Sequence, residues 1–294
     1  MFDTTFGTYN HALREQIRGW LAEDIGSGDI TTATTIPMGS QSTAVIHVKE
    51  SGIIAGLPVA RIVFEIVDPS LRFEAKVIDG ERVEKGTVIA TVEGSTHSLL
   101  TGERLALNLM QRLSGIATKT NAFVTALEGL PVRLVDTRKT TPGHRMLEKY
   151  AVRVGGGANH RFGLYDAVMI KDNHIKGAGG IRQAVEASRA AIPHTMKIEV
   201  EAECIEQVEE ALACGADIIM LDNMAPALMT EAVSLIKSRS PHVIVEASGN
   251  VRLDTVRSIA ACGVDVISVG GLTYSFNALD ISLDLNEKKG GARA

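Results

Sequence analysis

The stretch from Asp136 to Lys176 concentrates residues that could bind and activate an anionic substrate. It holds eight lysines or arginines against four acidic residues, so it carries a formal charge of +4 in a chain whose net charge is −5. Arg138 and Lys139 directly follow one short apolar run, and Lys171 follows another. Such runs are typical of buried strands, and cations at the ends of buried strands line clefts and collect anions. We therefore expect an anion-binding site at these strand ends.

Three further cations of the same stretch, Arg145, Lys149 and Arg153, lie four residues apart. That spacing places them on one face of an expected helix. We interpret them as a solvated charged face rather than as part of the site.

The elements that must position these cations follow a regular rhythm from residue 132 onward. Short apolar runs alternate with helical segments, and successive runs end 21 to 35 residues apart, which is typical of βα units. The six runs end at Asp136, Lys171, Glu201, Asp222, Ser248 and Gly270. Six such units predict a parallel sheet, either open and doubly wound or closed as a small barrel. Because a polar residue stands at every end, and barrels carry their chemistry there, we predict an α/β barrel with its site at the C-terminal mouth.

The N-terminal part of the chain shows a different pattern. We expect helices at 8–24, 57–67 and 97–127 (interrupted near Ser114–Gly115), a loop over EDIGSGDITT, and strands at 42–50, 71–78, 87–92 and 279–285. Strands grouped with a few helices predict an α+β domain with an antiparallel sheet. We expect the last strand to return to this sheet rather than to form a seventh βα unit.

The strand ends together suggest a substrate class. Carboxylates at Glu201 and Asp222, opposite the cations, suit a phosphorylated substrate with a divalent metal, or a carbocation-like transition state beside an anionic leaving group. The strand ends ASGN and VGGL are glycine-bearing loops ahead of helices, where backbone N–H groups bind phosphate in barrels. GGGAN is not a dinucleotide fingerprint, and no GxSxG motif occurs. The residues predict a phosphorylated small-molecule substrate without naming the reaction.

The amino-acid composition limits where the protein is expected to be located and what it is expected to bind. With 45% hydrophobic and 22% charged residues, the chain reads as a globular protein, and no apolar run approaches the ~20 residues of a membrane helix. The first residues lack the pattern of a signal peptide, and the three cysteines show no CxxC spacing, so we expect a cytoplasmic protein. A negative net charge and 4% aromatic residues argue against nucleic-acid binding.

Eight motifs in order resemble one family over residues 20–285. They are EDIGSGDITT, GERLALNLMQRLSGIAT, DTRKTTPG, EKYAVRVGGGANHRFGLYDAVMIKDNHI, IEVE, IIMLDN, EASGN and SVGGLT. The chain resembles quinolinate phosphoribosyltransferase, the carboxylating nicotinate-nucleotide pyrophosphorylase of NAD synthesis. The resemblance implies an N-terminal α/β sandwich (residues 1–115, with a strand within 276–294 returning to it). It also implies an incomplete, TIM-like six-stranded α/β barrel (116–275).

The resemblance also implies an activity: quinolinate and phosphoribosyl pyrophosphate give nicotinate mononucleotide, pyrophosphate and CO₂, with Mg²⁺ as cofactor. It implies a homodimer, or a higher oligomer, whose site takes Arg104 from the partner subunit. Arg104, Arg138, His160 and Arg161 would hold the quinolinate carboxylates, with Thr137 also binding substrate. Lys139 and Lys171 would bind pyrophosphate and the substrate's charge. Glu201 and Asp222 would face the ribose, its metal and the developing oxocarbenium. The 5′-phosphate would lie against Ser248, Gly249, Asn250, Val269, Gly270 and Gly271. Tyr274 stands where many members carry histidine.

Three other functions compete with this interpretation. A nicotinate phosphoribosyltransferase would share the fold but omit the decarboxylation. A barrel lyase would use Lys139 or Lys171 as a Schiff base, which requires a lysine in an apolar pocket. A non-catalytic binding protein would have no use for Glu201 and Asp222 opposite the cations.

Overall fold

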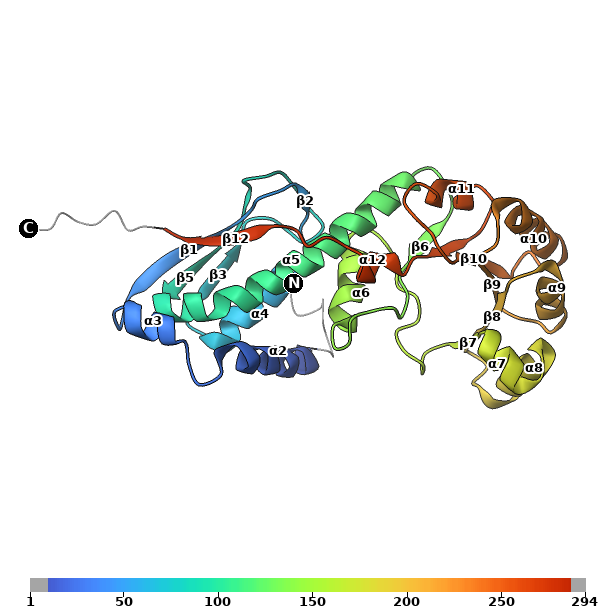
Figure 1. Ribbon diagram of the computed structural model, residues 1–294, viewed down its shortest axis with the longest axis horizontal. Coiled ribbons are helices and arrows are strands. Elements are labelled where there is room, and N and C mark those ends of the chain that lie inside the picture. The colour runs from blue at the N-terminus through green and yellow to red at the C-terminus, as the bar shows by residue number, and fades with distance from the viewer. Residues whose placement is uncertain (1–9, 287–294) are drawn as a thin grey trace, which may run out of the picture. The chain divides into compact units, whose positions relative to one another are not determined.

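The computed structural model describes residues 10–286 (Figure 1). The described chain divides into two compact units, residues 10–118 with 277–286, and residues 119–276. None of the described helices combines the length and the apolar character needed to span a membrane.

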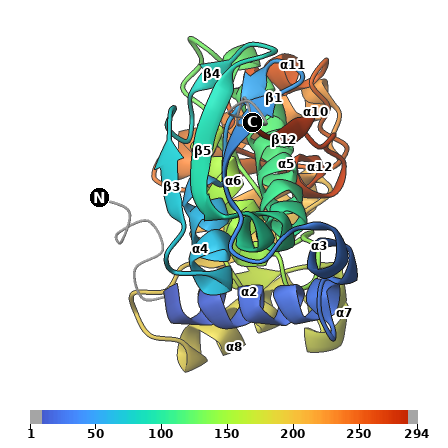
Figure 2. The ribbon, with the colours of Figure 1, turned by 90° about the vertical axis from the view of Figure 1, so that its left-hand side faces the viewer.

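The first unit is built on a four-stranded antiparallel sheet with the order β12-β1-β5-β3 (Figure 2). Its strands are β1 (Gln41–Val48), β3 (Arg72–Ala75), β5 (Val88–Ser95) and β12 (Ile281–Leu285). A two-stranded ribbon joins β2 (Gly52–Ile53) to β4 (Arg82–Val83). The alternation in β1 buries Ala44, Ile46 and Val48 on one face, and Ile46 pairs with Ala90 and Leu283. The end of the described chain thus completes a sheet begun near its start.

Four helices accompany this sheet. They are α2 (Asn10–Ile25), α3 (Ile30–Thr35), α4 (Leu57–Val67) and α5 (Thr96–Ala126). Helix α2 packs against α4, and α4 contacts β3. The predicted loop at EDIGSGDITT is wrong in its second half, where α3 begins. Asp29 caps that helix by accepting a hydrogen bond of 2.9 Å from the backbone N–H of Thr32, which stabilises even a six-residue helix.

Helix α5 runs unbroken for 31 residues, so the predicted interruption at Ser114–Gly115 is wrong. Both residues serve packing instead. The Ser114 hydroxyl accepts from the Ala55 N–H at 3.0 Å and lies 3.1 Å from the Ala55 carbonyl. A Cβ on Gly115 would lie 2.1 Å from the Asn277 carbonyl oxygen, so only glycine permits this close approach. Small residues here admit neighbouring backbone and do not end the helix.

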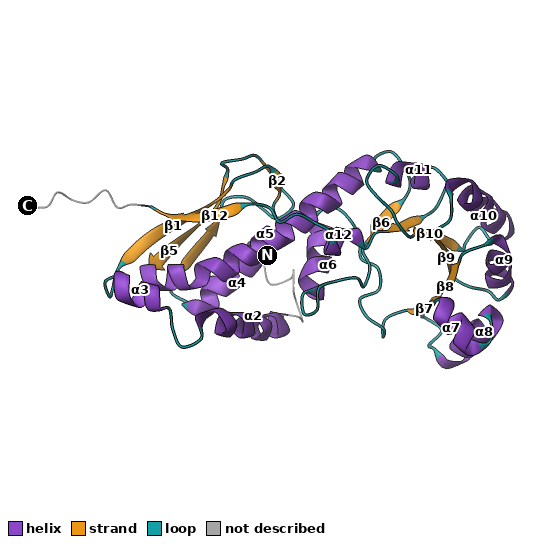
Figure 3. Cartoon of the chain, viewed as in Figure 1, coloured by secondary structure: helices purple, strands orange, loops and turns teal. Residues whose placement is uncertain are grey.

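The second unit contains a six-stranded parallel sheet that curves with helices on its outside (Figure 3). The strands are β6 (Arg133–Val135), β7 (Val168–Ile170), β8 (Ile198–Ala202), β9 (Ile218–Asp222), β10 (Ile244–Ser248) and β11 (Val266–Ser268). Their order is β6-β11-β10-β9-β8-β7, which is the order of a barrel opened between β6 and β7. The predicted fold class, an incomplete α/β barrel beside an α/β sheet domain, is confirmed.

Helices connect and cover these strands. They are α6 (Arg145–Val154), α7 (Asp172–Ala178), α8 (Ile181–Ala191), α9 (Ile205–Ala213), α10 (Pro226–Arg239), α11 (Val256–Ala260) and α12 (Gly271–Tyr274). Strand β8 alternates the apolar Ile198, Val200 and Ala202 with Glu199 and Glu201, and all five side chains are buried. Because successive strand residues point to opposite faces, one face of β8 presents carboxylates while the other is apolar.

Candidate active site

A cavity of about 600 Å³ lies at the C-terminal ends of the barrel strands. Fourteen of the fifteen residues predicted for the site line it. They are Thr137, Arg138, Lys139, His160, Arg161, Lys171, Glu201, Asp222, Ser248, Gly249, Asn250, Val269, Gly270 and Gly271. The fifteenth, Arg104, belongs to the first unit. It lies on α5, more than half exposed, with its guanidinium 3.8 Å from the Glu103 carboxylate.

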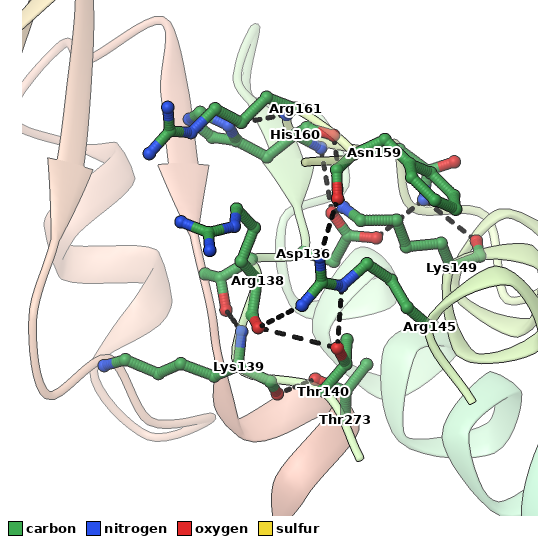
Figure 4. A network of polar contacts seen from close by, with 12 residues as sticks. Asp136, Arg138, Lys139, Thr140, Arg145, Lys149, Asn159, His160, Arg161 and Thr273 are labelled. Carbon is green, nitrogen blue, oxygen red and sulfur yellow. Dashed lines mark hydrogen bonds and ion pairs between the residues drawn. The ribbon is translucent and has the colours of Figure 1, made fainter. Parts of the chain in front are cut away.

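Two guanidinium groups, those of Arg138 and Arg161, define one side of the cavity. Figure 4 shows their side chains and that of Lys139 extending the same way from the polypeptide. Neither arginine forms an ion pair with a carboxylate within residues 10–286, and the buried Nε of Arg138 has no hydrogen-bond partner there. Burial, and then the charge of Arg138, lower the pKa of Arg161. Glu199 and Asp166 offset part of this effect from a distance. Two neighbouring guanidinium groups without a carboxylate in direct contact within the described chain favour a dianionic ligand.

A buried polar network fixes the backbone that carries these arginines (Figure 4). Asp136, fully buried, accepts from the ammonium of Lys149 at 2.5 Å, the Asn159 amide at 2.7 Å and the His160 N–H at 2.8 Å. The Lys149 ammonium also donates to the His160 carbonyl at 3.1 Å. Burial raises the pKa of Asp136 and lowers that of Lys149, each offset by the partner's charge.

This network corrects one prediction. Lys149, expected on a solvated helix face, is 2% exposed. Arg145 is half-buried and donates to the Thr140 hydroxyl at 3.0 Å and to the Phe162 carbonyl at 3.2 Å, while Arg153 alone of the three is exposed. The physical reason is that the segments before and after α6 both cover this face. The cations therefore meet the Asp136 carboxylate, the Thr140 hydroxyl and the carbonyls of His160 and Phe162 instead of water.

His160 contacts two carboxylates that the sequence analysis missed. Its Nε2 lies 3.3 Å from Glu199 Oε2 and 3.4 Å from Glu246 Oε2, and both glutamates are almost fully buried. Burial lowers the pKa of His160, but hydrogen bonds to the two carboxylates and their charges outweigh it and raise the pKa to about 10. Burial also raises the pKa of Glu199. This cluster lies on the inward face of the barrel.

The ends of β8 and β9 carry the predicted carboxylates of the cavity, Glu201 and Asp222. Glu201 forms an ion pair with the ammonium of Lys171, whose side chain is 42% exposed. One Asp222 oxygen accepts from the Asn223 amide at 2.7 Å. Lys139 reaches the cavity without a carboxylate partner in the described chain, and its N–H donates to the Thr137 hydroxyl at 3.0 Å. One lysine is therefore neutralised and one is available to an anion.

Glycine-bearing loops complete the cavity. At Gly249 the backbone has φ +91°, and a Cβ there would lie 2.2 Å from Asn223 Oδ1, so this turn requires glycine. The Asn250 amide donates to the same Asn223 oxygen at 3.0 Å. A Cβ on Gly270 would lie 2.9 Å from carbons of both Lys139 and Tyr274. At these glycines no side chain separates the backbone from the cavity.

Comparison with known proteins decides the family. Residues 29–114 match the N-terminal domain of quinolinate phosphoribosyl transferase, and residues 116–284 match its C-terminal domain. This chain belongs to the quinolinate phosphoribosyltransferase family. It is 49% identical, over 92% of its length and 91% of the relative's, to a probable nicotinate-nucleotide pyrophosphorylase [carboxylating] of Synechocystis. The corresponding Bacillus subtilis protein is 46% identical, covering 94% of each chain.

Solved structures agree with this assignment. NadC from Streptococcus pyogenes superposes with a TM-score of 0.89 at 42% identity, covering 94% of this chain and 97% of that one. A human nicotinic acid phosphoribosyltransferase, at 13% identity and a TM-score of 0.61, shares the fold alone. The predicted family is therefore confirmed, and as a member of that family the chain is a pentosyl transferase.

Three residues of the site, Lys149, Glu199 and Glu246, were not predicted from the sequence. A period-two signal was present for Glu199, since IEVEA alternates apolar and acidic residues through a strand. Glu246 has the weaker signal of one acid within an apolar run.

Proposed function

We propose that this protein joins quinolinate to phosphoribosyl pyrophosphate and decarboxylates the adduct, giving nicotinate mononucleotide, pyrophosphate and CO₂. The observation that carries the proposal is the pair of unneutralised guanidinium groups, Arg138 and Arg161, in the same cavity as a glycine-lined cradle. A dicarboxylate suits the first feature and a phosphate the second.

The two arginines also favour quinolinate over nicotinate. Nicotinate carries one carboxylate, so its binding would leave one half-buried guanidinium without an anion. A site built for two charged groups rejects a substrate that lacks one, because the unmatched group loses its water without gaining a partner. The decarboxylating reaction is therefore the better supported of the two phosphoribosyl transfers.

The chemistry follows from the placement of charge. The pyridine nitrogen attacks C1′ of the ribose, and the C1′–O bond breaks with its electron pair leaving on pyrophosphate. The ring is now a pyridinium, which accepts the electron pair released when the adjacent carboxylate departs as CO₂. That ring carbon then takes a proton from water. Lys139, which has no carboxylate partner in the described chain, is placed to neutralise the departing pyrophosphate.

Glu201 and Asp222 are proposed to act at the ribose and at a magnesium ion. Carboxylate oxygens are ligands that Mg²⁺ prefers. Asp222 bonds Asn223 through one oxygen and Glu201 bonds Lys171 through one oxygen, so each retains a second oxygen that fits the ion. When bound, Mg²⁺ would neutralise charge on the pyrophosphate. The carboxylates themselves stabilise positive charge developing at C1′. They would repel a dianion, so we assign them to the ribose and the metal instead of to quinolinate.

A shared site and a cellular location complete the proposal. The resemblance implies a homodimer, or a larger assembly, in which Arg104 reaches the partner's cavity. Arg104 is an exposed cation whose guanidinium lies 3.8 Å from the Glu103 carboxylate. Mixing inactive Arg104→Ala with inactive Lys139→Ala chains should restore activity; a mixture that exchanges subunits and stays inactive contradicts sharing. A cytoplasmic location, supported by three cysteines that form no disulfide, is tested by cell fractionation.

One assay tests the reaction. Purified protein, quinolinate, phosphoribosyl pyrophosphate and Mg²⁺ should yield nicotinate mononucleotide and CO₂ in equal amounts, and nicotinate should not replace quinolinate. Product from nicotinate without CO₂ would favour the non-decarboxylating alternative. A Schiff-base lyase is disfavoured because Lys171 is paired with Glu201 instead of lying in an apolar pocket, and borohydride trapping would detect one.

A further inference from the structure

His160 is held at every polar atom it has. Its backbone N–H donates to the Asp136 carboxylate at 2.8 Å, and its backbone carbonyl accepts from the Lys149 ammonium at 3.1 Å. Its ring Nδ1 accepts from the backbone N–H of the next residue, Arg161, at 2.7 Å. Its ring Nε2 lies between two buried carboxylates. A residue bonded this completely has one position.

The two ring contacts determine where the ring proton lies. Because Nδ1 accepts a hydrogen bond, it carries no proton, so Nε2 carries it and donates toward Glu199 and Glu246. The raised pKa of His160 corresponds to a doubly protonated ring, which the hydrogen bond accepted at Nδ1 does not accommodate, so the contact geometry decides the protonation of the ring here. Burial also raises the pKa of Glu199.

The same geometry argues against a metal. A histidine with two glutamates, all within 4.8 Å, has the composition of a cation site. A metal on Nε2 would leave the ring proton on Nδ1, where it would face the Arg161 N–H. The cluster is instead a hydrogen-bonded support under the cavity.

We propose that Glu199 and Glu246 are positioning residues for quinolinate binding: they hold the His160 ring by Nε2, and the ring holds the backbone of Arg161 by Nδ1. This inference rests on the proposed function, which places Arg161 against a quinolinate carboxylate. The guanidinium is fixed at its other end, where Nη1 donates to the Ala167 carbonyl at 2.9 Å. Glu199 on β8 and Glu246 on β10 thus influence the position of Arg161 through His160, which lies in a loop.

The glutamates themselves do not need to be charged for this role; they need an acceptor oxygen. Glutamine keeps the shape and one acceptor, whereas leucine keeps the approximate volume and has none. The experiment therefore compares Glu199→Gln/Glu246→Gln with Glu199→Leu/Glu246→Leu, and includes both single leucine variants. Asp217→Asn is the matched control, because Asp217 accepts from the Ile198 N–H at the opposite end of β8.

Calorimetry of quinolinate and of phosphoribosyl pyrophosphate, each alone, gives the readout. We expect the double leucine variant to lose about tenfold or more in quinolinate affinity, as for one buried hydrogen bond, with phosphoribosyl pyrophosphate affinity unchanged. The double glutamine variant and Asp217→Asn should bind both ligands normally. Nitrogen-15 NMR of labelled histidine, assigned with His160→Gln, should show a protonated Nε2 and an unprotonated Nδ1 in the parent protein.

Three outcomes overturn the inference: normal quinolinate binding by the double leucine variant, an equal loss of both ligands, or a protonated Nδ1. If the double leucine variant does not fold, the single leucine variants carry the same comparison, each with a smaller loss. A parent protein that binds no quinolinate would overturn the proposed function instead, so the two failures are distinguishable.

Discussion

The two sides of the cavity are built on different principles. On the arginine side, positions are set by buried side chains: Asp136, Lys149 and His160 bond to one another and to the backbone. On the phosphate side, positions are set by bare backbone at Gly249, Gly270 and neighbouring residues. The first side is dense with charge, whereas the second contains few charged groups.

The difference follows from the ligands proposed for each side. Two guanidinium groups repel each other, so they stay together only where the polypeptide that carries them is firmly held. Backbone N–H groups carry no net charge and need no counterion, so glycine turns suffice for a phosphate. The arginine side should therefore depend on distant buried residues, and the phosphate side on local steric space.

The sharpest test of this contrast removes the buried cation. Lys149→Met leaves Asp136 buried without its counterion, so we expect a loss of about 3–5 kcal/mol in the free energy of unfolding. Urea denaturation at pH 7 measures it. Asp136→Asn in the same chain removes the stranded charge and should recover much of the loss; no recovery would mean that Lys149 acts by packing alone.

The same variant should show a definite pH dependence. Burial raises the pKa of Asp136, and Lys149 no longer offsets it in Lys149→Met. A carboxyl group whose folded pKa is raised stabilises the fold below its unfolded pKa, about 3.9, and loses that contribution as pH rises through the folded value. The deficit against the parent protein should therefore shrink toward pH 4 and grow toward pH 7. A deficit that is constant across this range contradicts the assignment.

Variants of the two cavity carboxylates, Glu201 and Asp222, should separate effects on chemistry from effects on substrate binding. Glu201→Gln or Asp222→Asn should lower kcat by about 10²–10³, because each removes charge aimed at the ribose and metal. Quinolinate affinity should hold or improve, since a repelling carboxylate is gone. Thermal unfolding measured beside kcat and quinolinate Kd shows whether folding is the cause; an intact kcat would end the proposal.

The features that could be predicted from the sequence are those that repeat along the chain. The strand ends follow from apolar runs and their spacing, so the lining residues from Thr137 to Gly271 were within reach. The pairing of Lys149 with Asp136 was not, because helical spacing says which residues share a face but not what covers it. Glu199 and Glu246 look like exposed strand positions until the sheet curves and places them inside. Ser114–Gly115 resembled a helix break because small residues in a helix have two uses, and only neighbouring backbone distinguishes them.

Removing one guanidinium should cost less than the changes above. Arg161→Ala loses a charge-assisted hydrogen bond, about 1.5–3 kcal/mol, and quinolinate affinity should fall correspondingly by about 10- to 150-fold. Arg161→Lys keeps the charge but loses the planar, two-pronged hydrogen-bonding geometry of guanidinium, so it should recover part of the lost quinolinate affinity. Arg138→Ala should behave like Arg161→Ala. Normal kcat/KM for quinolinate in both alanine variants would exclude a two-arginine clamp.

The smallest effect should come from the phosphate side, and it tests whether steric space is what matters there. Gly270 has an ordinary φ of −64°, so alanine is compatible with its backbone. The added methyl would lie 2.9 Å from Lys139 and Tyr274 carbons, which belong to side chains that can move aside. We therefore expect Gly270→Ala to fold normally and to raise KM for phosphoribosyl pyrophosphate by about fivefold, as for ~1 kcal/mol of crowding. Quinolinate Kd should not change. Gly177→Ala, on α7 with nothing within 4 Å of the new methyl, is the control and should leave both constants unchanged. If Gly270→Ala weakened quinolinate as much as the phosphorylated substrate, the two sides would not be independent, because crowding at Lys139 would then reach the arginines through Thr137 and Arg138.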